Sequence, residues 1–283
     1  MNIATANLTE RRLKTSRLTV QHMQSLCGRD NAPRVLLLGG SNFDLRLKRN
    51  FLNSSLATHC DIATYEPRGI GRTEQPSGEW TMTDYAEDAL AVMDALKWQT
   101  AHILGESFGG MTALHVACIA PEKVISLTLS SATAGGKHAS FDISQFLELS
   151  RKDAALQAMC LQDTRYATLR TADPEAFAIA LHQRQDFELQ FANPSLNSGG
   201  YARLLSARLG HDCTKQLKQI YTPTTVIAGS FDMQARPEAQ KHLAVSMPNA
   251  NFYQYDAGHG VLFTTLEATD RALATIKQHT PVV

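Results

Sequence analysis

Short apolar runs alternate with helical patterns along most of the chain, and this rhythm limits the possible folds more than any other feature. Each run is short and rich in β-branched and other apolar residues, as parallel strands buried on both faces are. Strands that alternate with helices predict the α/β class, with a mainly parallel sheet and helices on both faces. The expected strands are residues 34–40, 61–66, 101–107, 126–132, 224–230 and 251–258.

The segments between and after these runs show helical spacing. Residues 83–98 gather apolar side chains on one face, with Thr83 as the expected N-cap. Residues 108–122 are almost wholly apolar, as expected of a helix buried against the sheet. Two more helices are predicted at 236–248 and 265–279, and the loose two-residue alternation of 12–26 predicts an antiparallel hairpin.

The alternation stops between residues 135 and 220, where no buried strand is evident and helical segments follow one another. The clearest are 141–159 and 173–191, the second opened by Asp173 and Pro174 at cap and first-turn positions. We therefore predict a helical insertion at 135–220 that serves as a cap or lid. The core domain is then 1–134 together with 221–283.

Composition narrows the class of partner. Lysine plus arginine equals aspartate plus glutamate at 27 each, so the net charge of zero does not favour nucleic acid or an anionic membrane. Five scattered cysteines without a Cys-x-x-Cys pair argue against a disulfide framework and a structural zinc site. The chain shows no signal peptide and no apolar run long enough to span a membrane, so we expect a cytoplasmic protein. Its oligomeric state is left open.

The stretch Gly105–Glu106–Ser107–Phe108–Gly109 matches the pattern G-x-S-x-G, placed between an expected strand and an expected helix. In this context the pattern predicts a nucleophile elbow, a tight turn that exposes the serine hydroxyl above the sheet. Glycines at the flanking positions avoid clashes with the strand and the helix. The turn also leaves the backbone N–H of Phe108 free at a helix N-terminus, where negative charge is favoured.

A serine hydroxyl needs a base to become a nucleophile, so the elbow predicts a carboxylate and a histidine further along the chain. Asp232 follows the expected strand 224–230, and His259 follows the expected strand 251–258. Catalytic groups collect at the carboxyl ends of strands in open α/β sheets. We therefore predict that Ser107, Asp232 and His259 form a catalytic triad.

In the same order along nearly the whole chain, the stretches GGS at 39–41, YEPRGIGRT, GESFGG, AGSFD and AGHG resemble the α/β-hydrolase superfamily. The resemblance implies an α/β-hydrolase fold, with Ser107 as nucleophile, His259 as general base and then acid, and Asp232 as the orienting carboxylate. It also implies an oxyanion hole built from the backbone N–H groups of Ser41 and Phe108, with Asn42 as a less favoured neighbour of Ser41.

These residues predict a serine hydrolase that cleaves a small, largely apolar carboxylic ester, lactone or thioester through an acyl-enzyme, without a cofactor or metal. Alternatives on the same triad are an aminopeptidase or amidase, with Glu106 as an amine anchor, and a C–C bond hydrolase. A non-catalytic ligand-binding member of the fold is a further alternative. His115 and His211 are expected to be structural, and Arg68 to shape a turn, whereas Arg72 could reach an anionic substrate.

Overall fold

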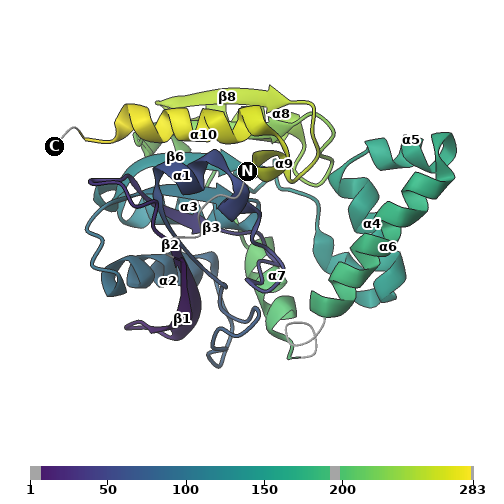
Figure 1. Cartoon of the computed structure of the whole chain (residues 1–283), viewed down its shortest axis with the longest axis horizontal. Helices are drawn as coiled ribbons and strands as arrows, with labels where there is room; N and C mark the ends of the chain where they lie inside the picture. The colour runs from purple at the N-terminus through teal and green to yellow at the C-terminus, as the bar shows by residue number, and fades with distance from the viewer. Residues whose placement is uncertain (1–7, 192–197, 282–283) are drawn as a thin grey trace.

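The computed structural model describes residues 8–191 and 198–281, and its centre is one eight-stranded sheet (Figure 1). The strand order is β1-β2-β4-β3-β5-β6-β7-β8. The strands β3 to β8 pair in parallel, while β1 and β2 form an antiparallel hairpin whose second strand pairs antiparallel with β4. The mainly parallel sheet and the hairpin are thus confirmed. The strands are β1 (Leu8–Lys14), β2 (Thr19–Ser25), β3 (Arg34–Leu38), β4 (Asp61–Tyr65), β5 (Ala101–Glu106), β6 (Val124–Ser130), β7 (Thr224–Gly229) and β8 (Ala250–Tyr255).

Helices cover both faces of the sheet, as the strand–helix alternation predicts. One face packs against α2 (Met82–Ala95), α3 (Phe108–Ile119) and α8 (Pro237–Val245) through a large apolar cluster that includes Val92, Leu114 and Leu243. The other face packs against α1 (Ser55–His59), α9 (Val261–Thr264) and α10 (Leu266–His279), with Leu56 and Ile276 among the contacts. Because helices cover both faces of the sheet, the carboxyl edge of its strands is the part left open for a binding or catalytic site.

The expected N-cap of α2 is wrong by two residues. Thr81, not Thr83, caps the helix: its hydroxyl accepts from the backbone N–H of Asp84, and the Asp84 carboxylate accepts from the backbone N–H of Thr81. This reciprocal pair is a capping box, which needs an acidic residue three positions after the cap. Thr83 has Ala86 at that position, so the sequence already favoured Thr81.

Between β6 and β7 the described chain is helical. It contains α4 (Arg151–Gln162), α5 (Arg165–Ala172), α6 (Pro174–Phe191) and α7 (Gly200–Leu209), preceded by the 3-10 turn η3 (Ile143–Glu148). Figure 1 shows α4, α5 and α6 as a group beside the sheet, while α7 leads back toward it. A third apolar cluster, which includes Ile143, Phe191 and Leu204, joins these helices to Trp80 and Phe108 of the core. The helices therefore lie over the carboxyl edge of the sheet.

Candidate active site

The turn between β5 and α3 holds Ser107 in a strained conformation. Its φ of 55° and ψ of −116° place a non-glycine residue in a region that L-residues rarely adopt. The backbone N–H of Ser107 donates to the Ser130 carbonyl at 2.8 Å, which ties the turn to β6. The hydroxyl is thereby held at the carboxyl edge of the sheet.

The strain depends on close approach of the backbone at the two flanking glycines. A Cβ on Gly109 would lie 1.9 Å from the carbonyl oxygen of Leu38, and one on Gly105 would lie 2.5 Å from the carbonyl oxygen of Gly109. Neither position has room for a side chain, so the glycines let α3 start directly against β3 and β5.

We expect Gly109→Ala to lower the free energy of unfolding by about 3 kcal/mol or more, because the backbone of α3 or β3 must move to admit the methyl group. Urea unfolding followed by circular dichroism measures the effect. Gly210→Ala is the matched control: its Cβ would have 3.4 Å to the nearest atom, and its φ of −77° suits alanine. Equal stabilities for the two variants would contradict the steric account of the elbow.

The structure brings the three predicted residues into one hydrogen-bonded line. Ser107 Oγ lies 2.8 Å from Nε2 of His259, and Nδ1 of His259 lies 2.8 Å from Oδ2 of Asp232. The Asp232 carboxylate is fully buried. Its other oxygen, Oδ1, accepts two hydrogen bonds, from the backbone N–H groups of Gln234 and Ala235 at 2.9 Å each. Since a carboxylate can only accept, Nδ1 of His259 carries the proton, and the unprotonated Nε2 faces the serine hydroxyl.

His259 is fixed from its backbone as well. Its N–H donates to the Gln162 carbonyl at 2.7 Å, and its own carbonyl accepts from the Ser131 hydroxyl. The imidazole is 8% exposed and Ser107 is 6% exposed, so both are reached only through the pocket above them. The fixed ring and the limited access of water favour proton transfer to a bound molecule.

A chain of side-chain amides, which we call the amide relay, reaches His259 from the helical segment. Arg184 of α6 donates to Oε1 of Gln162 at 2.8 Å, so Gln162 must turn its Nε2 to Oε1 of Gln234, at 3.0 Å. That leaves Nε2 of Gln234 2.9 Å from Nε2 of His259. Because arginine can only donate, the direction of every bond in the relay follows. Sequence reasoning missed Arg184, Gln162 and Gln234, since no motif marks them; only Gln234, two residues after Asp232, lies near a triad residue in the chain.

The pocket above Ser107 is lined by the core and the helical segment together, and it is more polar than expected. Besides Ser107 and His259 it is lined by charged side chains: Lys48, Glu106, Arg151, Arg184 and Glu188. Glu188 pairs with Arg184 at 2.7 Å, whereas the part-buried Lys48 places its Nζ 4.7 Å from the centre of the Phe187 ring, and desolvation lowers the pKa of its ammonium group. Apolar side chains such as Phe146 and Leu147 line the pocket as well, so the lining is mixed and the largely apolar substrate stays a prediction.

The residues predicted for the oxyanion hole lie beside the serine. Ser41 belongs to the turn after β3 and lines the pocket with Gly40 and Asn42, and a Cβ on Gly40 would lie 3.7 Å from the Cβ of Ser107. Phe108 is the first residue of α3 and is buried, with its ring edge-on to Tyr85 at 4.8 Å. Tyr201 of α7 lines the pocket together with Ser41.

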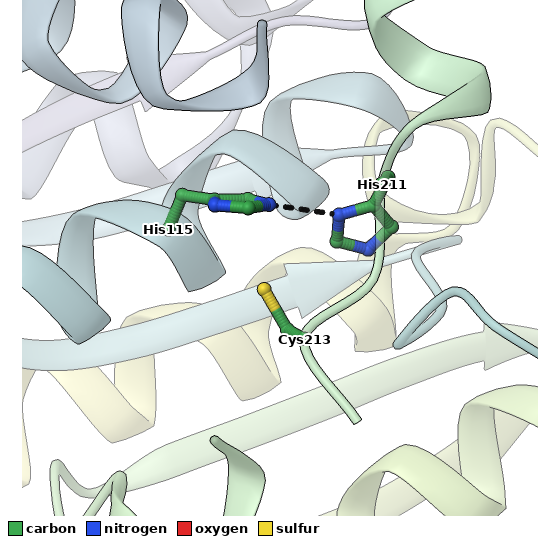
Figure 2. A group of neighbouring side chains, drawn as sticks. All are labelled: His115, His211 and Cys213. Atoms are coloured by element: carbon green, nitrogen blue, oxygen red, sulfur yellow. Dashed lines mark hydrogen bonds between the residues drawn. The ribbon is translucent and has the colours of Figure 1, made fainter. Parts of the chain in front are cut away.

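The other histidines considered from the sequence lie away from this pocket. His115, on the third turn of α3, meets His211, and Nε2 of the first lies 3.1 Å from Nδ1 of the second, with Cys213 beside them (Figure 2). His211 is buried and contacts the Thr133 carbonyl, not its sequence neighbour Asp212. These three residues form a separate cluster outside the triad.

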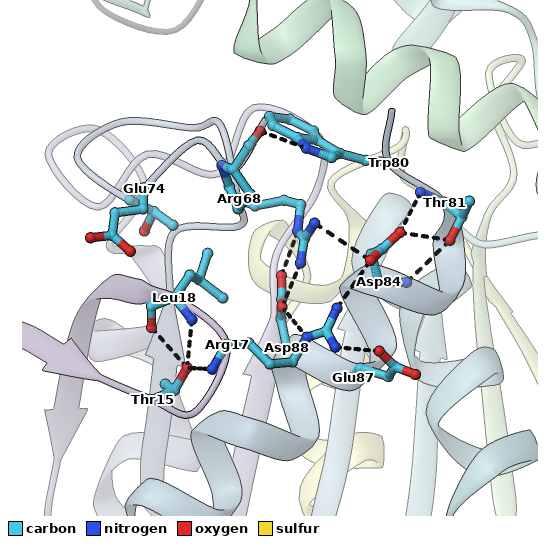
Figure 3. Close-up of polar contacts among 12 residues, drawn as sticks. Thr15, Arg17, Leu18, Arg68, Glu74, Trp80, Thr81, Asp84, Glu87 and Asp88 are labelled. Atoms are coloured by element: carbon cyan, nitrogen blue, oxygen red, sulfur yellow. Dashed lines mark hydrogen bonds and ion pairs between the residues drawn. The ribbon is translucent and has the colours of Figure 1, made fainter. Parts of the chain in front are cut away.

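Arg68 and Arg72, the two arginines considered from the sequence, form ion pairs away from the pocket at Ser107. Arg68 is buried and holds Asp88 of α2 through two hydrogen bonds of 2.7 Å, and Arg17 from the β1–β2 turn binds the same carboxylate (Figure 3). Arg72 pairs with Glu66 and Glu10 at 2.8 Å and does not line the pocket at Ser107, so its suggested contact with an anionic substrate is not supported. Arg17 thus fastens the hairpin to α2, and Arg68 fastens the turn after β4 to the same helix.

Comparison with known proteins gives the class. The sequence profile of the α/β hydrolase fold matches residues 33–265, and the chain therefore belongs to this family. Among curated proteins it is 28% identical over 242 residues, 82% of this chain and 88% of the relative, to "Putative carbamate hydrolase RutD" of Pseudomonas savastanoi pv. phaseolicola. It is 25% identical over 247 residues to the poly(3-hydroxyalkanoate) depolymerase of Ectopseudomonas oleovorans, 85% of this chain and 83% of that one.

Among solved structures, the enol-lactonase from Burkholderia xenovorans LB400 superposes with a TM-score of 0.78, covering 95% of this chain and all of that one at 21% identity. At that identity the match shows the shared fold alone. The family and the names of the relatives support a hydrolase, and they span more than one type of bond. Within the described residues, no helix is both long and apolar enough to cross a bilayer.

Proposed function

We propose that the protein is a serine hydrolase that cleaves a small carboxylic ester or lactone through an acyl-enzyme. The observation that carries the proposal is the line from Ser107 through His259 to Asp232, with both contacts at 2.8 Å and all three side chains sequestered from bulk water. A strained serine, an imidazole whose unprotonated Nε2 faces the serine hydroxyl and a buried carboxylate are the parts that acyl transfer requires.

In the first step Ser107 Oγ attacks the substrate carbonyl carbon while His259 Nε2 takes the hydroxyl proton. The negative charge on the carbonyl oxygen is stabilised by the backbone N–H groups of Phe108 and Ser41, each worth about 3 to 4 kcal/mol. His259 then gives its proton to the leaving oxygen. Water enters, loses a proton to the same nitrogen and releases the acid, while Asp232 stays ionised and holds the ring.

We propose that residues 135–220 act as a cap over a core of residues 1–134 and 221–283. Arg151, Gln162, Arg184 and Glu188 reach the pocket from α4 and α6, opposite Lys48 and Glu106 from the core. A substrate must enter between these two sets of side chains. Their charges favour a small substrate that carries polar groups beside the scissile bond.

The class is tested with p-nitrophenyl acetate and a serine-reactive fluorophosphonate. The protein should release p-nitrophenol in a burst followed by steady turnover, and mass spectrometry should locate the phosphonate on Ser107. A folded protein that neither hydrolyses activated esters nor takes the label at Ser107 would be a non-catalytic member of the fold. The values of kcat/KM are then compared between substrates with different scissile bonds. These substrates are lactones, aryl carbamates, aminoacyl anilides and, for C–C cleavage, a β-diketone.

Asp232→Asn should lower kcat toward p-nitrophenyl acetate by about 10⁴-fold, because an amide N–H facing Nδ1 would favour the wrong imidazole tautomer. Stopped-flow and steady-state rates measure this loss. Asp256→Asn is the matched control: Asp256 is exposed and lies at the end of β8, and its variant should keep the wild-type rate. Comparable rates for both variants would mean that Asp232 does not orient the histidine.

A further inference from the structure

Four metal-binding side chains meet where α3 faces the loop that follows α7. His115 and Cys118 come from one face of α3, and His211 and Cys213 come from the loop (Figure 2 shows all but Cys118). The ligand atoms of His115, His211 and Cys213 all lie within 4.8 Å of one another. Cys118, three residues after His115 on α3, is close enough to the Cys213 thiol for the two groups to interact. The cluster lies apart from the triad and the mechanism uses none of it.

The spacing of the two imidazoles suits a tetrahedral ion. Bonds of about 2.0–2.1 Å to nitrogen and about 2.3 Å to sulfur place neighbouring ligand atoms roughly 3.3 to 3.8 Å apart, the shortest separation being that of two nitrogens. Nε2 of His115 and Nδ1 of His211 are 3.1 Å apart, so a shift of a few tenths of an ångström would admit the ion.

His211 is already held in the form that binds a metal. Its Nε2 lies 2.8 Å from the Thr133 carbonyl, which can only accept, so the proton is on Nε2 and the lone pair of Nδ1 faces His115. A backbone carbonyl on the distal nitrogen is the usual second contact of a metal-bound histidine.

We infer that His115, Cys118, His211 and Cys213 form a structural site for a zinc-like divalent cation. Two nitrogens and two thiolates make a closed tetrahedral set, and such sites stabilise folds. The ion replaces the thiol protons of Cys118 and Cys213, which are released to solvent, and the ring proton of His115 moves from Nε2 to Nδ1. The ion then links His115 and Cys118 of α3 to His211 and Cys213 of the loop, and so fixes the path of the chain from α7 to β7.

The test uses the reduced, full-length protein after removal of metal with a chelator. We expect it to bind one equivalent of Co²⁺ with the visible bands of a tetrahedral ion and a thiolate-to-metal charge-transfer band, both displaced by Zn²⁺. At a hundredfold excess over Kd, Zn²⁺ should raise Tm by about 5 °C. Cys213→Ser and His115→Gln should each abolish the tetrahedral bands. Cys118→Ser should reduce the charge-transfer band to about half, since one of two thiolates is lost.

Cys160→Ser is the control, since Cys160 is a part-buried cysteine of α4 outside the cluster, and it should keep every band. Circular dichroism of each metal-free variant establishes that it is folded. The inference is overturned if the reduced protein shows no thiolate band and no rise in Tm. It is equally overturned if Cys160→Ser removes the band, or if the protein as purified carries a Cys118–Cys213 disulfide.

Discussion

Replacing Ser107 with alanine is expected to lower kcat toward p-nitrophenyl acetate by about 10⁴- to 10⁶-fold, the largest kinetic effect we predict for any single residue. The variant loses the nucleophile, so no acyl-enzyme forms and only the pocket and the backbone N–H groups still act on a bound ester. The free energy of unfolding should not fall, because alanine keeps the same Cβ as serine and the flanking glycines still set the backbone conformation of the turn. Burst kinetics and phosphonate labelling measure the loss.

Ser206→Ala is the matched control, since Ser206 is exposed on α7, away from the pocket lining. It should keep the burst, the steady rate and the label at position 107. If Ser107→Ala retained more than a small part of the wild-type kcat, the nucleophile would have to be another residue and the proposed function would fail.

The protein should unfold steeply in mild acid. His22, His102 and His211 are buried, and burial lowers the pKa of each from 6.5 to about 4. In the unfolded chain they titrate near 6.5, so between pH 6.5 and 4 the unfolded state binds up to three more protons and stability falls as pH falls. The free energy of unfolding then falls by up to about 4 kcal/mol for each unit by which the pH drops. The total loss from the three histidines approaches about 10 kcal/mol, as large as a typical free energy of unfolding.

Glu66 offsets part of this loss, because burial raises the pKa of its carboxyl group and the folded state then gains a proton in acid. We therefore expect acid unfolding near pH 5, measured as the urea midpoint at a series of pH values.

His22 is the sharpest probe of this acid unfolding, since it is fully buried and neither ring nitrogen has a hydrogen-bond partner among the residues that the structure describes. His22→Leu should remove about 1.4 kcal/mol per pH unit from the slope. His182→Gln should not, because His182 is largely exposed. A urea midpoint that is unchanged from pH 7 to pH 5 would refute the effect.

Much of the fold could be predicted because each core strand is a short apolar run, α2 and α10 carry a one-sided apolar face, and α3 is almost wholly apolar. The six runs correspond to β3 to β8, although several strands end one or two residues early, where the backbone turns toward the site. Short helices such as α1 and α5 were missed, since five to eight residues give too little periodicity to detect. α7 was missed as well, and Leu204 and Leu205 bury it against the core.

The three triad residues could be predicted because each follows a strand of a parallel sheet, and the carboxyl ends of those strands share one edge. The pocket could not, because its charges come from side chains far apart in the sequence: Lys48 lies between β3 and β4, and Arg184 lies on α6. No local pattern marks two such residues as neighbours. The same holds for His115 and His211, which meet only when α7 returns to α3.

The amide relay ties the position of the helical segment to the electronic surroundings of the imidazole. Arg184 and Gln162 belong to α6 and α4, whereas Gln234 and His259 belong to the sheet side of the molecule. If either helix moves away from the sheet, at least one of these three bonds lengthens and Gln234 loses the restraint that aims its N–H at Nε2. The orientation of the Gln234 amide beside His259 is thus coupled to how α4 and α6 sit on the sheet, and a molecule that wedges these helices apart would release that amide before it reached Ser107.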